Sequence, residues 1–311
     1  MLRFALELMP SLAIGLLLGR CLPGLPARLA PPLVRWGVPI SLVGLLLRSG
    51  LHPDLLISGL MAALASGGGL LLIRGLPPLR ERLARASLQL GSVVGNTAYW
   101  GLPAALALLP PAALAPVISY DLVGSLVTWS VGPLMREGRK RSFGAILAAL
   151  VGSPAGRGLL IALVLQQTPW SDAIAALLWW PARTVLLLAL SLVGMRLGLV
   201  LRVAPGGAVA GERPGGGQGL ALAMLAKLVI LPAALLAATA LLPLPELVGD
   251  AVVLQAAAPT AVSVLLIAEA AEARGREGEA APAAALVAWS TLAAMITVPL
   301  WWLLLQRLPP G

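Results

Sequence analysis

The chain has 311 residues, of which 59% are hydrophobic and only 11% are charged, whereas a soluble domain carries roughly a quarter of charged residues. This composition excludes an ordinary soluble fold, and the continuous apolar runs lack the alternation that is typical of a membrane β-barrel. A single cysteine, Cys21, excludes an internal disulfide, and one histidine leaves too few ligands for a multi-histidine metal centre. We therefore expect neither a metal nor a cofactor.

Ten segments are apolar enough to cross a bilayer, which takes about 20 helical residues. Numbered 1 to 10 in chain order, these spans are 2–19, 32–50, 55–76, 88–109, 114–135, 154–170, 174–199, 219–242, 247–269 and 281–305. The sequence predicts an all-α integral membrane protein with ten transmembrane helices.

Basic residues are divided unevenly between the loops. Those in the odd-numbered loops are Arg20, Arg28, Arg35, Arg74, Arg80, Arg82, Arg85, Arg136, Arg139, Lys140, Arg141, Arg196, Arg202, Arg213, Arg274 and Arg276. The opposite side has only Arg3, Arg48 and Arg307. The positive-inside rule then places the odd loops in the cytoplasm and both termini outside, in an inner or plasma membrane. The net charge of +9 thus reports topology, and we expect the lipid bilayer, not nucleic acid, as a partner.

Short motifs recur between the two halves of the chain in the same order. The letters "SLVG" occur at 41–44 in span 2 and at 191–194 in span 7. "SVGPL" at 130–134 in span 5 is echoed by "TVPL" at 297–300 in span 10. Such matches indicate an internal repeat.

Five spans per half is an odd number, so the second half must lie inverted in the membrane, as in many secondary transporters. We predict a first repeat at 1–141 and an inverted second repeat at 142–311, which together form one membrane transport domain.

Span 4 contains "GNTAYWGLP" at 95–103, a poor sequence for a helix in lipid. Pro103 lacks a backbone donor and clashes with the carbonyl four residues back, and Gly101 loosens the helix further. Asn96 and Thr97 lie near the bilayer midplane. Because backbone groups freed in hydrocarbon are costly, such a break is expected only against protein or a watery cavity.

Span 9 repeats this feature, with Gln255, Pro259 and Thr260 near mid-depth. The alternative, a simple proline kink, is less favoured for a symmetry-related pair that carries polar side chains. We predict that spans 4 and 9 are broken and cross. The amino ends of the resulting half-helices would offer N–H groups and partial positive charge to a carboxylate.

Two ionisable residues lie within the predicted spans. Lys227 is about nine residues into span 8, where it is either a counter-charge for an anion, a group that titrates during the cycle, or a snorkelling lysine. Asp121 in span 5 either binds a coupling proton or sodium, pairs with Lys227, or lies at the outer interface.

Four stretches resemble the auxin efflux carrier family, which includes bacterial permeases for malate and related organic acids and the plant PIN carriers. They are "GNTAYWGLP", "SYDLVGSLVTWSVGP" at 119–133, "LAKLVILP" at 225–232 and "AAAPTAVSVLLIAE" at 256–269. The resemblance covers nearly the whole chain in the order of its spans. The long loop between spans 5 and 6 of plant members is absent, so auxin itself is not implied.

This resemblance implies a scaffold of spans 1, 2, 6 and 7, a transport unit of spans 3–5 and 8–10, a homodimer, and elevator-like movement. It also implies that Asn96 faces the substrate and that Pro103 and Pro259 are the crossover prolines.

We predict a secondary transporter that moves a small organic anion, a carboxylate, by alternating access. The candidate substrate-binding residues are Asn96, Thr97, Gly101, Pro103, Gln255, Pro259, Thr260 and Lys227. The alternative is a sodium- or proton-coupled antiporter or symporter of a related broken-helix fold, with Asp121 as a possible coupling site. Neutral Asn96 and Gln255 at the crossing favour the anion carrier. An enzyme is not expected, because no acid cluster or histidine pair is present, and no nucleotide motif is seen.

Overall fold

A computed structural model describes residues 2–50, 54–137, 143–203, 216–275 and 277–308. Within these ranges the chain forms helices and no strand, apart from one isolated antiparallel bridge between Gly95 and Thr260. The prediction of an all-helical fold is confirmed for this part of the chain. Loop residues Arg139, Lys140, Arg141, Arg213 and Arg276 lie outside it, as does the boundary at 141–142 between the predicted repeats.

The helical elements in chain order are α1 (Leu2–Cys21), α2 (Leu25–Pro32), η1 (Leu33–Gly37), α3 (Val38–Ser49), α4 (Asp54–Ala63), η2 (Leu64–Gly68), α5 (Gly69–Gly75), α6 (Pro77–Arg82), α7 (Ala86–Gly91), η3 (Thr97–Gly101), α8 (Leu102–Leu108), η4 (Pro111–Ala113), α9 (Leu114–Glu137), α10 (Phe143–Gly152), α11 (Pro154–Gln166), α12 (Ser171–Val203), α13 (Gly216–Leu225), η5 (Ala226–Ile230), α14 (Leu231–Leu241), α15 (Glu246–Ala256), α16 (Val262–Glu272) and α17 (Ala280–Leu305). Four of the η elements are π-helical turns, and η4 is a short 3₁₀ helix.

Seven continuous helical segments of the described chain are long and apolar enough to cross a membrane. They are Phe4–Cys21, Leu25–Ser49, Leu55–Gly75, Pro111–Val131, Ser171–Leu201, Gly217–Leu241 and Ala280–Leu305. The chain is therefore a multi-pass membrane protein.

The three other predicted spans are not single long helices. Predicted span 6 corresponds to α11, which has 13 residues and begins after a turn where Ser153 Oγ accepts a hydrogen bond from Gly156 N at 2.9 Å. Predicted span 4 is divided between α7 and η3–α8, and predicted span 9 between α15 and α16. The count of ten spans stays a prediction.

Prolines explain three of the four π-helical turns, η1, η3 and η5. Pro39, Pro103 and Pro232 each occupy the second residue of an α-helix that follows such a turn. A proline cannot donate to the carbonyl four residues back, and the wider turn relieves the clash with that carbonyl. Two of the freed carbonyls take donors from elsewhere: Arg35 O accepts from Arg157 Nη2 at 3.4 Å, and Leu228 O accepts from Trp301 Nε1 at 2.9 Å.

The position of the break in span 4 differs from the prediction. The non-helical residues are 92–96, and the chain is helical from Thr97 through Pro103. Pro103 therefore widens a helix and does not end it, because η3 accommodates its missing donor. In span 9 the non-helical residues are 257–261, and they include Pro259.

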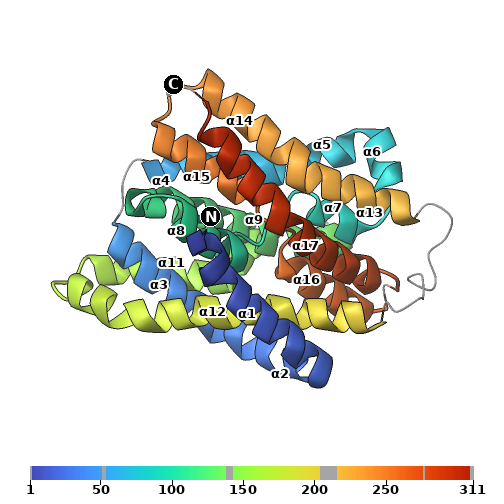
Figure 1. Cartoon of the computed structure of the whole chain (residues 1–311), viewed down its shortest axis with the longest axis horizontal. Helices are drawn as coiled ribbons and strands as arrows, with labels where there is room; N and C mark the ends of the chain where they lie inside the picture. The colour runs from blue at the N-terminus through green and yellow to red at the C-terminus, as the bar shows by residue number, and fades with distance from the viewer. Residues whose placement is uncertain (1, 51–53, 138–142, 204–215, 276, 309–311) are drawn as a thin grey trace.

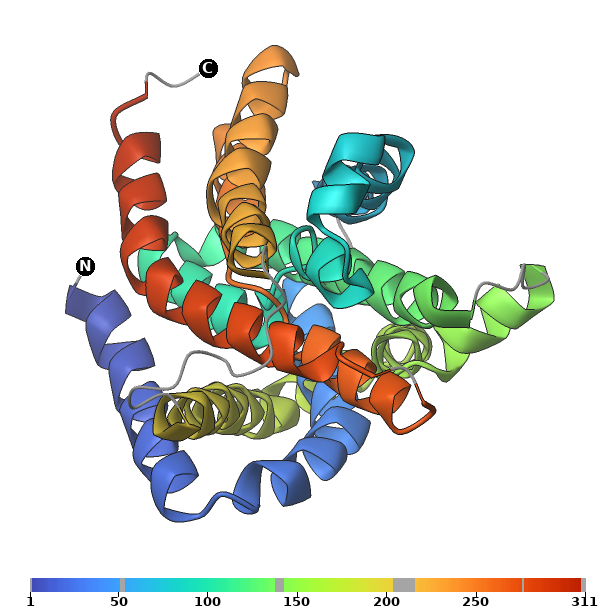
Figure 2. The same cartoon turned by 90° about the vertical axis from the view of Figure 1, so that its right-hand side faces the viewer.

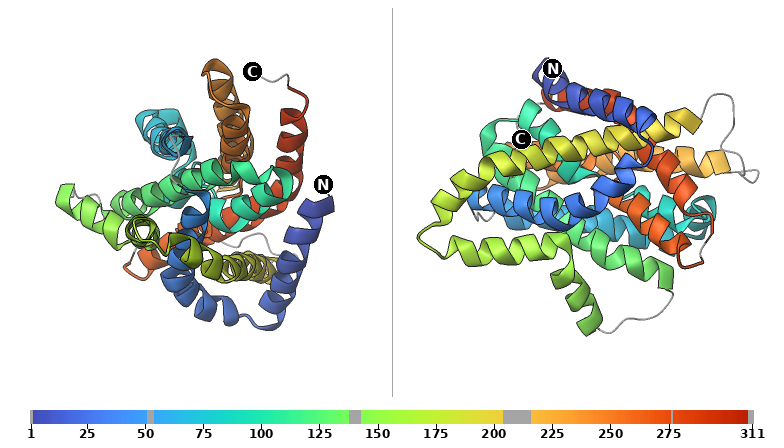
Figure 3. Two further views of the ribbon diagram at one scale, coloured as in Figure 1. Left: turned by 90° about the vertical axis from the view of Figure 1, so that its left-hand side faces the viewer. Right: turned by 90° about the horizontal axis from the view of Figure 1, so that it is seen from below.

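The helices form two groups with the interrupted segments between them. Helix α12 packs against α1 and α3, and α3 packs against α11, which places these helices together along the lower side of Figure 1. Helices α13–α15 lie on the opposite side. Figure 2 shows α12 and α13–α14 on either side of α17, and Figure 3 shows α12 running along most of the molecule.

Glycines allow α1 and α12 to pack at close range. A Cβ on Gly15 or Gly19 of α1 would overlap the carbonyl of Ser191 or Met195, and a Cβ on Gly194 of α12 would overlap the α1 backbone. Small residues spaced four apart are typical of such membrane-helix contacts. Gly194 is the last residue of the second "SLVG" motif, so this motif marks a packing site.

Candidate functional site

The two helix interruptions meet at the centre of the molecule. Asn96 N donates to Pro259 O at 2.6 Å, and Ala261 N donates to Val94 O at 3.2 Å. Residues 92–96 and 257–261 therefore pair as two short antiparallel segments, which we call the crossing. Its residues are buried, since Ala257, Ala258 and Thr260 are fully buried and Asn96 is 4% exposed.

Side chains satisfy backbone groups that the crossing frees. Thr260 Oγ1 donates to Gly91 O at 2.8 Å, at the carboxyl end of α7, and Thr260 N donates to Ser290 Oγ of α17 at 3.0 Å. Lys227 Nζ donates to Ala256 O at the carboxyl end of α15. Each freed group left without a partner in hydrocarbon would cost several kcal/mol, so these bonds allow the interruptions to exist at this depth.

A cavity of about 60 Å³ lies against the crossing, and we call it the central cavity. Its polar wall consists of Asn96, Thr97, Tyr99, Asp121, Ser125, Thr128 and Ser263. Val34, Val38 and Leu192, from η1, α3 and α12, line it from the other side. The central cavity thus lies between the α12 group and the interrupted helices.

Two helices begin at the central cavity. Thr97 is the first residue of η3 and Val262 the first residue of α16, and both line the cavity. The first N–H groups of a helix lack partners within that helix, and the helix dipole adds partial positive charge there. Two side-chain groups on the same wall, Asn96 Nδ2 and the Tyr99 hydroxyl, are buried and have no hydrogen-bond partner among the described residues. The wall therefore holds two hydrogen-bond donors, Asn96 Nδ2 and the Tyr99 hydroxyl, that a bound acceptor could use.

Asp121 contributes the one formally charged side chain on the described wall of the central cavity. Its Oδ1 accepts a hydrogen bond from Thr97 Oγ1 at 2.6 Å, which joins α9 to the first residue of η3. The sequence left three alternatives for Asp121: a site for a coupling proton or sodium, a partner for Lys227, or a carboxylate at the outer interface. Asp121 lines the cavity beside Asn96, and no ion pair joins it to Lys227 in the described part of the chain. Its role in coupling stays a prediction.

Lys227 lies on the other side of the crossing. It is fully buried within η5, which disfavours the alternative of a lysine that snorkels to the membrane surface. A small cavity of about 10 Å³ separates it from Ser66, Tyr120 and Gln255, and Gly95 and Thr97 line both cavities. Lys227 does not line the central cavity.

The remaining predicted site residues shape the crossing from outside the central cavity. Gly101 leaves room for Gln255, because a Cβ at position 101 would overlap Gln255 Oε1. Gln255 Nε2 donates to Val117 O at 3.3 Å, whereas its Oε1 has no partner among the described residues. Pro103, Pro259 and Thr260 likewise do not line the cavity. A direct role in substrate binding for this set stays a prediction.

The sequence analysis missed Tyr99, Ser263, Ser125 and Thr128. The last two follow Asp121 at intervals of four and seven residues, which places all three on one face of α9. This polar stripe in an otherwise apolar span was a readable signal.

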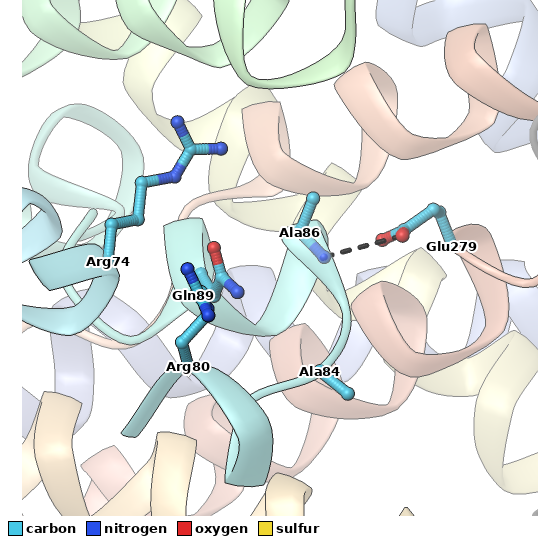
Figure 4. Close-up of a pocket in the computed structure, with 6 residues that line it drawn as sticks. All are labelled: Arg74, Arg80, Ala84, Ala86, Gln89 and Glu279. Carbon is cyan, nitrogen blue, oxygen red and sulfur yellow. Dashed lines mark hydrogen bonds between the residues drawn. The ribbon is translucent and has the colours of Figure 1, made fainter. Parts of the chain in front are cut away.

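A second, larger hollow of about 520 Å³ is lined by basic side chains (Figure 4). Arg74, Arg80 and Gln89 face it, and Glu279 lies beside Ala86. The Glu279 carboxylate accepts from Ala86 N at 3.3 Å and from Ser87 N at 2.9 Å, at the amino end of α7. This basic hollow shares no residue with the central cavity.

Comparison with known families agrees with a membrane protein. Residues 142–302 match the model of a family described as "Membrane transport protein". This match includes Lys227, Gln255 and the α15–α16 interruption, and it covers just over half of the chain. No curated protein matches the chain. The chain therefore belongs to the membrane transport protein family, which is the family of the auxin efflux carriers.

Proposed function

We propose that this protein is a secondary transporter that moves a small carboxylate across a cell membrane by alternating access, with the substrate bound in the central cavity. The observation that carries the proposal is the meeting of two helix amino ends with unpartnered donors, Asn96 Nδ2 and the Tyr99 hydroxyl, at one buried cavity. Helix amino ends are ready-made anion sites, and hydrogen bonds to an ionised acceptor are roughly twice as strong as neutral ones.

The size of the central cavity favours a short substrate. On the same measure one water needs about 10–15 Å³, so a volume of about 60 Å³ holds roughly five waters. A short aliphatic carboxylate fits this space, whereas a bulky aromatic acid would require the wall to move. We therefore expect short mono- and dicarboxylates to be preferred.

Asp121 supports coupling to protons. Two carboxylates in one buried pocket repel each other, so binding of an anion beside Asp121 favours the protonated form of one of them. The titratable and charged groups that face Asp121 from the described wall are limited to Tyr99, while Thr97 donates a hydrogen bond to it. Symport of a carboxylate with a proton is thus the second element of the proposal, and it is preferred to antiport.

The packing supports alternating access. The α12 group supplies Val34, Val38 and Leu192 to one wall, and the interrupted helices with α9 supply Asn96 and Asp121 to the other. We propose that the first group is the scaffold of an inverted-repeat carrier and that the second moves against it, which would open the cavity to either side in turn. The homodimer that the family resemblance implies would form through this scaffold.

Arginine positions support the topology with both termini outside. The Arg74–Arg85 segment, the end of α12, the start of α13 and the α16–α17 turn all lie toward the right-hand end of Figure 1. The amino end of α1 and the carboxyl end of α17 point away from it. We propose that this end faces the cytoplasm.

Uptake into proteoliposomes tests the proposed function. We expect labelled short mono- and dicarboxylates to accumulate faster than in protein-free vesicles, with acceleration by an inward proton gradient and none by a sodium gradient. A bulky aromatic acid should enter slowly or not at all. Transport of organic cations with no transport of any carboxylate would contradict the proposal.

A further inference from the structure

A buried ammonium group contacts the crossing from the side opposite the central cavity. Lys227 is fully buried, and its Nζ donates to Ala256 O, the carbonyl of the last residue of α15. The π-helical turn η5 carries this side chain, and Pro232 just beyond it explains why the turn is present. A Cβ on Gly95 would lie 3.2 Å from Nζ, so the ammonium also adjoins the backbone of the crossing.

The carboxyl end of an interrupted helix attracts cations. Its last carbonyls lack partners within the helix, and the helix dipole places partial negative charge on them. In transporters with discontinuous helices, such ends and the adjoining unwound carbonyls coordinate sodium or protons. Here the carboxyl end of α7 is capped by the neutral Thr260 hydroxyl, whereas the carboxyl end of α15 is capped by the Lys227 ammonium.

Oxygen atoms surround the ammonium. Gln255 Oε1 is buried without a hydrogen-bond partner among the described residues, and Ser66, Thr97 and Tyr120 line the same small cavity as Lys227. That cavity of about 10 Å³ has space for about one water. Its described lining contains no carboxylate, so the positive charge is balanced by carbonyl and hydroxyl dipoles and not by an ion pair.

We propose that Lys227 is a built-in cation, whose ammonium occupies the place at the carboxyl end of α15 that a bound monovalent cation would otherwise take. An ammonium in this place leaves no room there for a sodium ion. This inference deepens the proposed function by excluding sodium from this position. Its stability test, however, needs no substrate.

Two substitutions of Lys227 make a matched pair, because both remove the ammonium group but they leave cavities of different size in its place. Lys227→Ala removes the ammonium and leaves an oxygen-lined hole large enough for a sodium ion or methylammonium. Lys227→Met removes the same charge and fills most of the hole with an apolar side chain. Thermal unfolding of each purified protein in lipid is compared in sodium chloride, methylammonium chloride and N-methyl-D-glucamine chloride at equal ionic strength.

The expected result is specific to the Ala variant. Its Tm should rise with the logarithm of the sodium or methylammonium concentration above Kd, by about 2 °C at ten times Kd for a chain of this size. The wild-type protein and Lys227→Met should show no such rise. A folded Lys227→Ala protein that responds to neither cation, or a Lys227→Met protein that responds equally, would overturn the proposal.

The wild-type protein allows a second test, which does not require that any variant fold. Its carboxylate uptake should be the same in sodium-free and sodium-containing media, and loss of uptake without sodium would overturn the built-in cation. If no carboxylate is transported at all, the proposed function fails, while the Tm comparison still decides the role of Lys227. Uptake by Lys227→Ala should be slow in N-methyl-D-glucamine and increase several-fold in sodium.

Discussion

Asn96→Ala is the substitution that examines the anion site most closely. The side chain is 4% exposed and its Nδ2 has no partner among the described residues, whereas its backbone N–H donates to Pro259 O. Alanine keeps that backbone bond, so the crossing should survive. A hydrogen bond to an ionised group contributes about 1.5–3 kcal/mol. At about 1.4 kcal/mol per tenfold change, carboxylate binding should weaken by roughly 10- to 150-fold.

The assay is calorimetric titration of a transported carboxylate into purified protein, together with tracer uptake. Because Nδ2 has no hydrogen-bond partner among the described residues, the Tm without substrate should stay close to the parent value. Thr239→Val is the matched control, since the bond that Thr239 Oγ1 makes among the described residues goes to Leu236 O within α14, at 3.0 Å. An Asn96→Ala protein that binds and transports every carboxylate like the parent would refute the assignment of Asn96 to the site.

Three further predictions concern the pH dependence and the packing. Carboxylate uptake by the parent should slow as pH rises and Asp121 ionises, and Asp121→Asn should flatten this profile; an unchanged profile would remove Asp121 from coupling. Gly194→Val should lower the Tm, because its side chain would overlap the α1 backbone and overpacking costs about 1–3 kcal/mol, whereas Gly67→Ala, where a Cβ meets nothing within 4 Å, should not. Thr260→Val should also lower the Tm, because it leaves Gly91 O without its donor at a cost of about 1–3 kcal/mol, and Thr260→Ser should restore it; equal values for the two would show that the hydroxyl is not needed.

Local composition was sufficient to predict the all-helical fold and the region of the crossing. Long apolar runs identify membrane helices whatever their partners are, because lipid demands that each span satisfy its own backbone. Polar side chains such as Asn96 and Thr97 are unfavourable in hydrocarbon, so their presence inside such a run indicated a polar surrounding. The structure places both on the wall of the central cavity. Their role in binding stays a prediction.

Tertiary contacts determined what the sequence could not predict. Pro103 is the obvious helix breaker in span 4, yet the break lies at 92–96, where pairing with residues 257–261 replaces the lost helical hydrogen bonds. The widened turn η3 accommodates the missing N–H of Pro103, so the helix continues through this residue. Similarly, the depth of Lys227 was readable from its place in span 8, but its acceptor, Ala256 O, belongs to a helix that only folding brings near.

A structure of the protein bound to a bromine-substituted short carboxylate tests the central claim most directly, because anomalous scattering from bromine locates the ligand without assumptions. We predict the bromine signal in the central cavity, with the carboxylate within hydrogen-bond distance of Asn96 Nδ2 and the first N–H groups of α16. A signal confined to the basic hollow beside Arg74 and Arg80, with none at the crossing, would contradict it.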